Sequence, residues 1–135
     1  MSKNEKFEFI DKVVDTLLNY CPQMMPEVAY FVGCQFALES NFGQSRLAKT
    51  KNNFCGMSLP KSRISLNIAS TGNFAEFESF DDCVIDYCYW LAWNKFNYLM
   101  LFNLELFTRH LIASKYCPET DYIDRIYSLF NSLKN

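Results

Sequence analysis

The chain has 135 residues, of which 50% are hydrophobic and 17% aromatic, and its formal net charge is −2. This length predicts one domain, residues 1–135, with enough residues to bury a core, and the composition excludes a disordered chain. The small net charge and the absence of a long basic run argue against a nucleic-acid-binding protein, which needs a clustered cationic face.

Targeting and membrane signals are also missing from the sequence. The first residues are polar and lead into an amphipathic segment, so we expect no secretory signal peptide and synthesis in the cytoplasm. Polar residues such as Asp86, Asn94 and Asn103 keep every apolar run short of the roughly 18 residues that a membrane-spanning helix requires. We therefore expect no stable insertion into a membrane.

The cysteine pattern favours free thiols over disulfides or a metal centre. The chain has six cysteines, and Cys34, Cys83 and Cys88 fall at apolar helical positions in a chain for which we expect no export signal. We expect reduced, mostly buried thiols. No CxxC pair is present and His110, the one histidine, has no partner at ligand spacing, so we expect neither a metal nor a cofactor.

Two helices are expected in the first forty residues. Apolar residues recur at intervals of three and four over residues 4–20, which predicts an amphipathic helix that Pro22 ends. Residues 26–40 are apolar on nearly all sides and predict the central buried helix. Glu39 lies at the end of this second helix, where the helix dipole and burial both disfavour its charge. We expect a raised pKa for Glu39, as a general acid requires.

The rest of the chain predicts a small β-lobe and further helices. A short helix is expected over residues 44–49, followed by a loop with Asn52 and Asn53. Residues 62–68 alternate polar and apolar side chains and residues 74–78 return after a turn with Gly72, which predicts a β-hairpin. Ser79 is expected to cap a helix that runs to about residue 93. Helical segments are then expected at residues 98–101, 104–114 and 119–133.

Four blocks of sequence carry a resemblance to a known family. They are residues 37–45 (ALESNFGQS), residues 52–57 (NNFCGM), residues 74–87 and, more weakly, residues 115–122 (KYCPETDY). In this order they resemble the endo-β-N-acetylglucosaminidases of glycoside hydrolase family 73, a family of peptidoglycan hydrolases that includes the flagellar rod-assembly hydrolase domain and many autolysins.

The resemblance implies a fold and an activity. It implies an α+β, predominantly α, lysozyme-like fold with a small β-hairpin lobe. It also implies cleavage of the β-1,4 bond between N-acetylglucosamine and N-acetylmuramic acid in peptidoglycan glycan strands, with Glu39 as the catalytic acid. Tyr116 would match a family tyrosine that holds the sugar or the carboxyl group, and the alternative for Tyr116 is a core ring before the last helix.

The second catalytic group is where this chain departs from the family. Glycosidases usually place two carboxyl groups about 5 Å apart for retention or about 6.5–9.5 Å apart for inversion. Residues 62–73 hold no Asp or Glu, so Glu76 is the first candidate and Glu78 the second, while Asp81 and Asp82 fit a helix N-terminus better. Without a second carboxylate, the 2-acetamido group of the substrate could attack the anomeric carbon. Alternatively, a water held by Ser65, Asn67 or Thr71 could make this attack.

Other functions stay open at this point. A muramidase or lytic transglycosylase on the same fold would cut the other glycosidic bond with the same Glu39. A glycan-binding relative that has lost catalysis is a candidate of another class. We expect a monomer that reaches the cell wall after release from the cytoplasm, as a phage endolysin does, although a virion-associated or effector role would fit as well.

Overall fold

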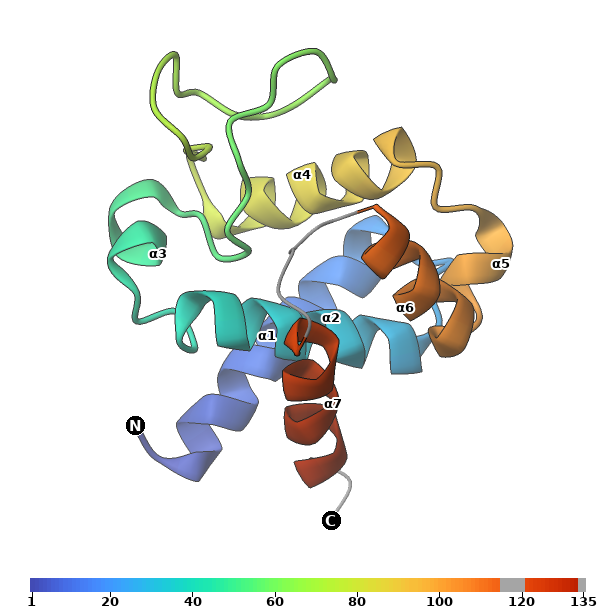
Figure 1. Cartoon of the computed structure of the whole chain (residues 1–135). Coiled ribbons are helices and arrows are strands. Elements are labelled where there is room, and N and C mark those ends of the chain that lie inside the picture. Colours follow the sequence, from blue (N-terminus) through green and yellow to red (C-terminus); the bar gives the residue numbers. More distant parts are fainter. Residues whose placement is uncertain (115–120, 134–135) are drawn as a thin grey trace.

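The computed structural model describes residues 1–114 and 121–133. Within them the chain is mostly helical, and α2 is the central one of the seven helices (Figure 1). In chain order the helices are α1 (Lys3–Tyr20), α2 (Pro26–Ser40), α3 (Arg46–Lys51), α4 (Phe80–Trp93), α5 (Tyr98–Leu101), α6 (Leu104–Ala113) and α7 (Tyr122–Ser132).

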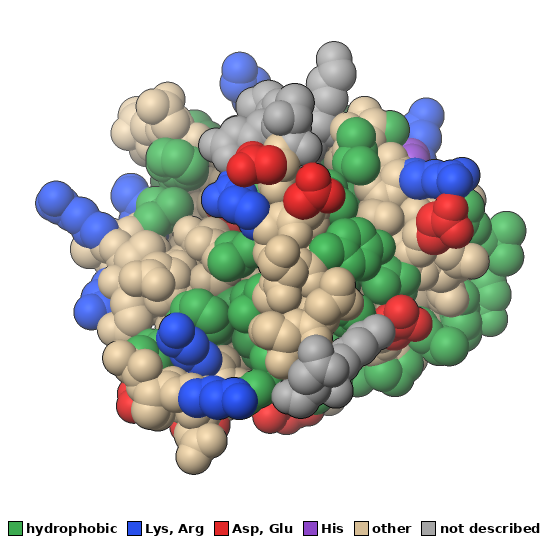
Figure 2. Space-filling view, turned by 60° about the horizontal axis from the view of Figure 1, so that its bottom comes forward, with side chains coloured by type: hydrophobic (Ala, Val, Ile, Leu, Met, Phe, Trp, Pro, Cys, Tyr) green, Lys and Arg blue, Asp and Glu red, His purple; other side chains and the backbone are tan. Residues whose placement is uncertain are grey.

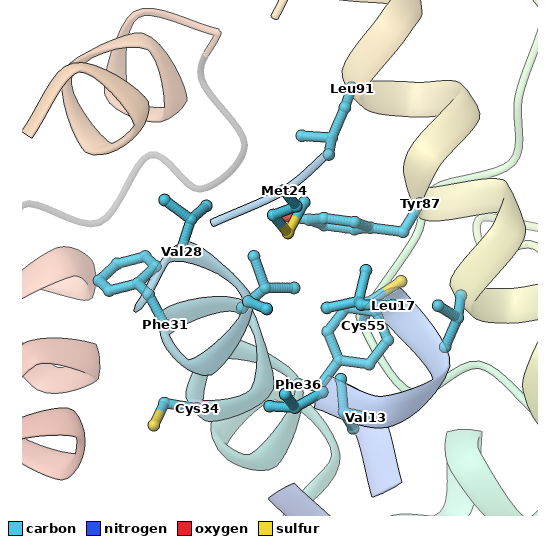
Figure 3. Packing of buried hydrophobic residues seen from close by; sticks show 14 of the residues in the cluster. Val13, Leu17, Met24, Val28, Phe31, Cys34, Phe36, Cys55, Tyr87 and Leu91 are labelled. Atoms are coloured by element: carbon cyan, nitrogen blue, oxygen red, sulfur yellow. The ribbon is translucent and has the colours of Figure 1, made fainter. Parts of the chain in front are cut away.

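Helix α2 forms the centre of the core because it is apolar on nearly every side. It packs against α1, α6 and α7, and α1 packs in turn against α4. Figure 3 shows Val28, Phe31 and Phe36 of α2 among the other buried side chains of the core. The prediction of a buried central helix over residues 26–40 is therefore confirmed.

Capping residues set the helix boundaries. A capping box at Ser2 begins α1, and Ser79 Oγ accepts the Asp82 backbone N–H at the start of α4, as the sequence predicts. Ser45 caps α3 in the same way, so this helix begins at Arg46 and not at residue 44. Helices α5 and α6 lie where expected, and α7 begins at residue 122; residues 119 and 120 of its expected span are outside the described residues.

The lobe between α3 and α4 (residues 52–78) is irregular. We expected a β-hairpin with strands at residues 62–68 and 74–78, and this prediction is wrong for the structure. Within this lobe the structure has a single β-bridge, between Ser58 and Phe74, and no named strand. In Figure 1 the lobe is the long green-to-yellow excursion that stands away from α4.

Side-chain hydrogen bonds explain why no regular strand pair forms. Asn53 is buried, and its Nδ2 donates to the carbonyl oxygens of Met57 and Ala75, each at 2.9 Å. Asn67 Oδ1 accepts the backbone N–H of Glu76 at 2.9 Å. The side-chain amides of Asn53 and Asn67 thus connect the two arms of the lobe. In a regular strand pair, backbone N–H and C=O groups alone would make these connections.

The Asp86 side chain of α4 fastens the lobe to this helix through hydrogen bonds. This side chain is fully buried, and Arg63 Nη2 donates to Oδ2 at 2.6 Å. Ser65 Oγ and the Leu66 backbone N–H donate to Oδ1 at 2.6 Å and 2.9 Å. A buried charge is tolerated only when it is paired and hydrogen-bonded, as this one is. The Asp86 carboxylate thereby fixes Arg63, Ser65 and Leu66 of an otherwise irregular segment.

The surface carries charges of both signs. Lys, Arg, Asp and Glu side chains are spread over the face seen in Figure 2, with hydrophobic side chains between them. None of the helices in residues 1–114 and 121–133 combines the length and the apolar character needed to cross a bilayer.

We predict that Asp86→Ala destabilises the protein strongly. The change leaves the Arg63 guanidinium buried without its counter-charge and removes two further hydrogen bonds of the lobe. Breaking a buried pair in this way costs about 3–5 kcal/mol of unfolding free energy, which urea denaturation monitored by circular dichroism would measure.

Glu105→Ala is the matched control. It also removes an ion pair, Glu105 with Arg109, but both side chains are largely exposed to water, so the unfolding free energy should hardly change. Equal stability losses in the two variants would contradict the role assigned to Asp86.

Candidate active site

Glu39 stands in the last turn of α2, where the chain makes a sharp left-handed turn. Asn41, Phe42 and Gly43 all have positive φ, with values of 49°, 55° and 81°. Ser40 Oγ supports this turn by accepting the Gly43 backbone N–H at 2.9 Å. The turn ends the buried helix directly after Glu39, so the carboxyl group lies at the boundary between the core and the surface.

The two main sequence blocks meet at this carboxyl group. A Cβ atom added at Gly56 would lie 2.8 Å from Glu39 Oε2, which is closer than real Cβ contacts allow. Gly56 also has φ +68°, a conformation that other residues rarely adopt. Only glycine therefore lets the Gly56 loop (residues 52–57) pass directly beside the Glu39 carboxylate. The expectation that both blocks belong to one site agrees with this contact.

A buried polar network lies behind Glu39. Gln35 precedes Glu39 by one helical turn and is fully buried, and its Oε1 accepts the Tyr87 hydroxyl at 2.7 Å. Burial raises the pKa of Tyr122, the negative charge of Glu39 raises it further, and hydrogen bonding with Gln35 partly offsets the rise. Tyr122 therefore stays a neutral hydroxyl beside the Glu39 carboxyl group.

A groove of about 290 Å³ begins at Gly56. Residues 56–63 form one wall, and Trp90, Trp93 and Asn94 from the end of α4 form the other, with Ser114 after α6. The Trp93 side chain is 56% exposed, so it offers a broad aromatic surface. Gly56 thus belongs both to the groove and to the surroundings of Glu39, and the groove offers an aromatic wall on which a flat, partly apolar ligand such as a sugar ring can stack.

Glu76, the predicted second carboxylate, has its own partner. Its Oε1 lies 3.7 Å from Lys51 Nζ, and both side chains are more than one-third exposed. Phe77 N–H donates to the Lys51 carbonyl oxygen, which places this arm of the lobe against the end of α3. Glu39 instead lies beside Gly56 and Tyr122, so the structure shows different surroundings for the two carboxyl groups.

The remaining carboxylates and polar candidates have other partners or lie on the surface. Glu78 is exposed, Asp81 accepts the Tyr20 hydroxyl at 3.0 Å, and Asp82 lies in the first turn of α4. The side chains of Ser65 and Asn67 are used inside the lobe, as described above, and Thr71 is exposed.

Tyr116 lies outside the described residues, so its expected place beside Glu39 stays a prediction. Tyr122, six positions later, is a tyrosine that the structure places near Glu39. Sequence reasoning also passed over Gln35 and Trp93. Gln35 had a detectable signal, because it is a polar residue four positions before Glu39 in an otherwise apolar helix.

A second hollow lies where α1, α2 and α7 meet. It measures about 500 Å³ and is lined by Phe7, Asp11, Glu27, Tyr30, Phe130 and Leu133. Although it is larger than the groove, neither Glu39 nor Gly56 belongs to its lining. In the described part of the chain no group of three or more His, Cys, Asp or Glu side chains is placed to hold a metal ion.

Comparisons with known proteins show the family and the fold of this chain. The family model named glucosaminidase, described as mannosyl-glycoprotein endo-β-N-acetylglucosaminidase, matches residues 26–135. That span includes Glu39, Gly56 and the whole groove. No curated protein matches the sequence significantly.

Two solved structures share the fold. One is a type VI secretion system effector–immunity complex from Pseudomonas protegens, with TM-score 0.67, 18% identity, and coverage of 98% of this chain and 96% of that one. The other is the catalytic domain of the autolysin Auto from Listeria monocytogenes, with TM-score 0.65, 16% identity, and coverage of 99% and 87%. With a family model over most of its length and a fold shared with an autolysin catalytic domain, the chain belongs to the glucosaminidase family of glycoside hydrolases, family 73.

Proposed function

We propose that the protein is a peptidoglycan hydrolase that cleaves the β-1,4 bond between N-acetylglucosamine and N-acetylmuramic acid. The observation that carries this proposal is the contact between the Glu39 carboxylate and Gly56 at the mouth of the groove. The autolysin among the structural relatives and the glucosaminidase family description support a cell-wall glycan as the substrate.

In this proposal Glu39 is the general acid. A glycan strand lies in the groove with its bridging oxygen beside the Glu39 carboxyl group, which protonates the leaving oxygen as the glycosidic bond breaks. The end of α2 carries negative potential from the helix dipole, and the neutral Tyr122 hydroxyl lies nearby. The dipole favours the protonated form of Glu39 before the reaction, and the hydroxyl provides a polar partner for the carboxyl group.

The group that completes the reaction is proposed to be Glu76. It stands on the lobe, where its Oε1 lies 3.7 Å from Lys51 Nζ, and its carboxyl group is of the kind that a nucleophile or general base needs. A route in which the substrate's own acetamido group or a bound water acts in place of Glu76 is the alternative. Tyr116 stays the family-based proposal for a residue that positions the sugar or the carboxyl group.

We further propose that the protein acts as a monomer and reaches the wall after release from the cytoplasm, as a phage lysin does. A secreted effector is the second candidate, and the effector–immunity complex among the structural relatives favours it. In that case an immunity protein would be an additional partner. A muramidase or transglycosylase specificity stays the alternative for the bond that is cut.

We predict that Glu39→Gln lowers the rate of wall lysis about 100–10,000-fold, the range expected when a general acid is removed. The amide is nearly isosteric, so the fold and the thermal midpoint should be preserved. Turbidity of purified peptidoglycan measures the rate, and mass spectrometry of the products from the unmodified enzyme identifies the bond: reducing-end N-acetylglucosamine is expected. Lysis at the normal rate by Glu39→Gln would contradict the assignment.

A second prediction separates the one-acid from the two-acid route. If Glu76 is the second catalytic group, Glu76→Gln should slow lysis by at least about 100-fold, whereas Glu78→Gln on the same arm should leave the rate nearly unchanged. Steady-state lysis rates at matched enzyme concentration measure both. Near-normal turnover in Glu76→Gln would exclude Glu76 and leave the substrate-assisted or water route.

Gly56→Ala is predicted to disturb the site while Gly72→Ala does not. Both glycines have positive φ, so both variants carry similar backbone strain of about 1 kcal/mol. Only the Cβ at Gly56 meets Glu39, whereas a Cβ at Gly72 meets nothing within 4 Å. We expect similar thermal midpoints but at least about 10-fold slower lysis for Gly56→Ala, because small displacements of catalytic groups cost rate. Equal activity in the two variants would show that the Glu39 contact is unimportant.

A further inference from the structure

Two cysteines meet at the base of the Gly56 loop. Cys55 Sγ and Cys83 Sγ lie 3.8 Å apart, although the two residues are 28 positions apart in the chain. Cys55 directly precedes Gly56 in the loop, and Cys83 lies near the start of α4. The sulfur contact therefore connects the loop that borders Glu39 to one of the main helices.

Both sulfur atoms are held firmly in this arrangement. The Phe54 backbone N–H donates to Cys83 Sγ at 3.4 Å, and Cys55 Sγ lies 4.0 Å from Asn53 Oδ1. Both cysteines are fully buried, and Figure 3 shows Cys55 among core side chains such as Leu17. The two thiols are thus already side by side, and forming a bond between them requires an approach of less than 2 Å, since a disulfide measures about 2.0 Å.

The other described cysteines differ from this pair. Cys34 is buried, and burial raises its pKa to about 12, so it is a poor nucleophile. Hydrogen bonding with Cys88 lowers the pKa of Cys21 to about 7, so these two thiols form a second close pair. That pair joins the end of α1 to α4 and includes no residue of the Gly56 loop, so it serves as a built-in comparison.

We propose that Cys55 and Cys83 form a disulfide when the protein encounters an external disulfide, and that this bond fastens the Gly56 loop to α4. The external disulfide is either oxidised glutathione or the active-site disulfide of a thiol–disulfide oxidoreductase. The inference concerns the covalent state of the loop and does not depend on which glycosidic bond the enzyme cuts.

The exchange proceeds in two balanced steps. One cysteine thiolate attacks the external disulfide, which forms a mixed disulfide and releases one external thiolate. The second cysteine, as its thiolate, then attacks the protein-bound sulfur of the mixed disulfide and displaces the other external thiolate. Cys55 and Cys83 together lose two electrons and two protons, and the external disulfide is reduced to two thiols.

Burial determines when this exchange can occur. Because neither sulfur is exposed, an external disulfide reaches them before the chain has folded or while the irregular lobe is lifted from α4. Once formed, the bond closes a loop of 28 residues in the unfolded chain, which reduces the conformational entropy of that state. We expect the thermal midpoint to rise by roughly 5–10 °C.

The test is to refold the full chain from denaturant in a glutathione buffer that contains oxidised glutathione. After acid quenching and alkylation of free thiols, non-reducing peptide mapping by mass spectrometry should show a cross-link between Cys55 and Cys83. In an acid-quenched sample that has not been alkylated, the intact mass should be about 2 Da below that of the reduced chain, because the balanced exchange removes two hydrogens. The rise in the thermal midpoint should disappear after reduction with dithiothreitol.

Variants keep the test decisive. Cys21→Ala should retain the cross-link and the rise in midpoint, whereas Cys55→Ala and Cys83→Ala should each lose both; if one of these two does not fold, the other gives the same answer. Cys34→Ala controls for the loss of a buried thiol. A chain that stays fully reduced, or whose only cross-link joins Cys21 and Cys88 or involves Cys117, would overturn the proposal.

Discussion

The close approach of one carboxylate to one glycine is the constraint on which the site depends. Glu39 lies in the last turn of a mostly buried helix, and the carboxyl group has room only because Gly56 carries no side chain. The left-handed turn at residues 41–43 stops α2 at the right place, and the Gly56 loop supplies the missing wall. Glu39 is half-buried and lies beside Gly56, a residue that also lines the groove, and a half-buried carboxyl group suits the proposed proton donation to a bound glycan.

The groove wall formed by residues 56–63 is held in place by polar side chains inside the irregular lobe. Asp86 gathers Arg63, Ser65 and the Leu66 backbone, while Asn53 spans the two arms. Such a lobe has little regular backbone hydrogen bonding of its own. Its shape therefore depends on a few buried polar side chains that are fully hydrogen-bonded. The same helix, α4, supplies Asp86, the two groove tryptophans and Cys83, so it connects lobe stability, substrate binding and the proposed cross-link.

Much of the helical framework could be predicted from the sequence, because its signals are local. The three-and-four periodicity of α1, the all-round apolar character of α2 and the Ser79 cap each indicate their element directly. The prediction of a β-hairpin was wrong. The alternation of polar and apolar residues over 62–68 also fits a segment whose hydrogen bonds go to a distant side chain such as Asp86. No local pattern shows that α4 will supply that partner.

Some residues of the candidate site could likewise be predicted from local sequence patterns, and others could not. The motifs around Glu39 and Gly56 are short and contiguous, so the family could be predicted from them, and Glu39 could be singled out as the candidate acid. Tyr122 and Trp93 approach the site only through the packing of α7 and α4, and neither has a spacing that would single it out. The second catalytic group is hardest to predict, because its place depends on an irregular lobe whose backbone no periodicity specifies.

A crystal structure of the Glu39→Gln variant with a bound peptidoglycan fragment tests the central claim most directly. The proposal predicts that the glycan occupies the groove between residues 56–63 and Trp93, with its bridging oxygen within about 2.6–3.2 Å of the side-chain amide at position 39. A fragment bound in the hollow between α1, α2 and α7, or a bridging oxygen out of reach of position 39, would contradict it.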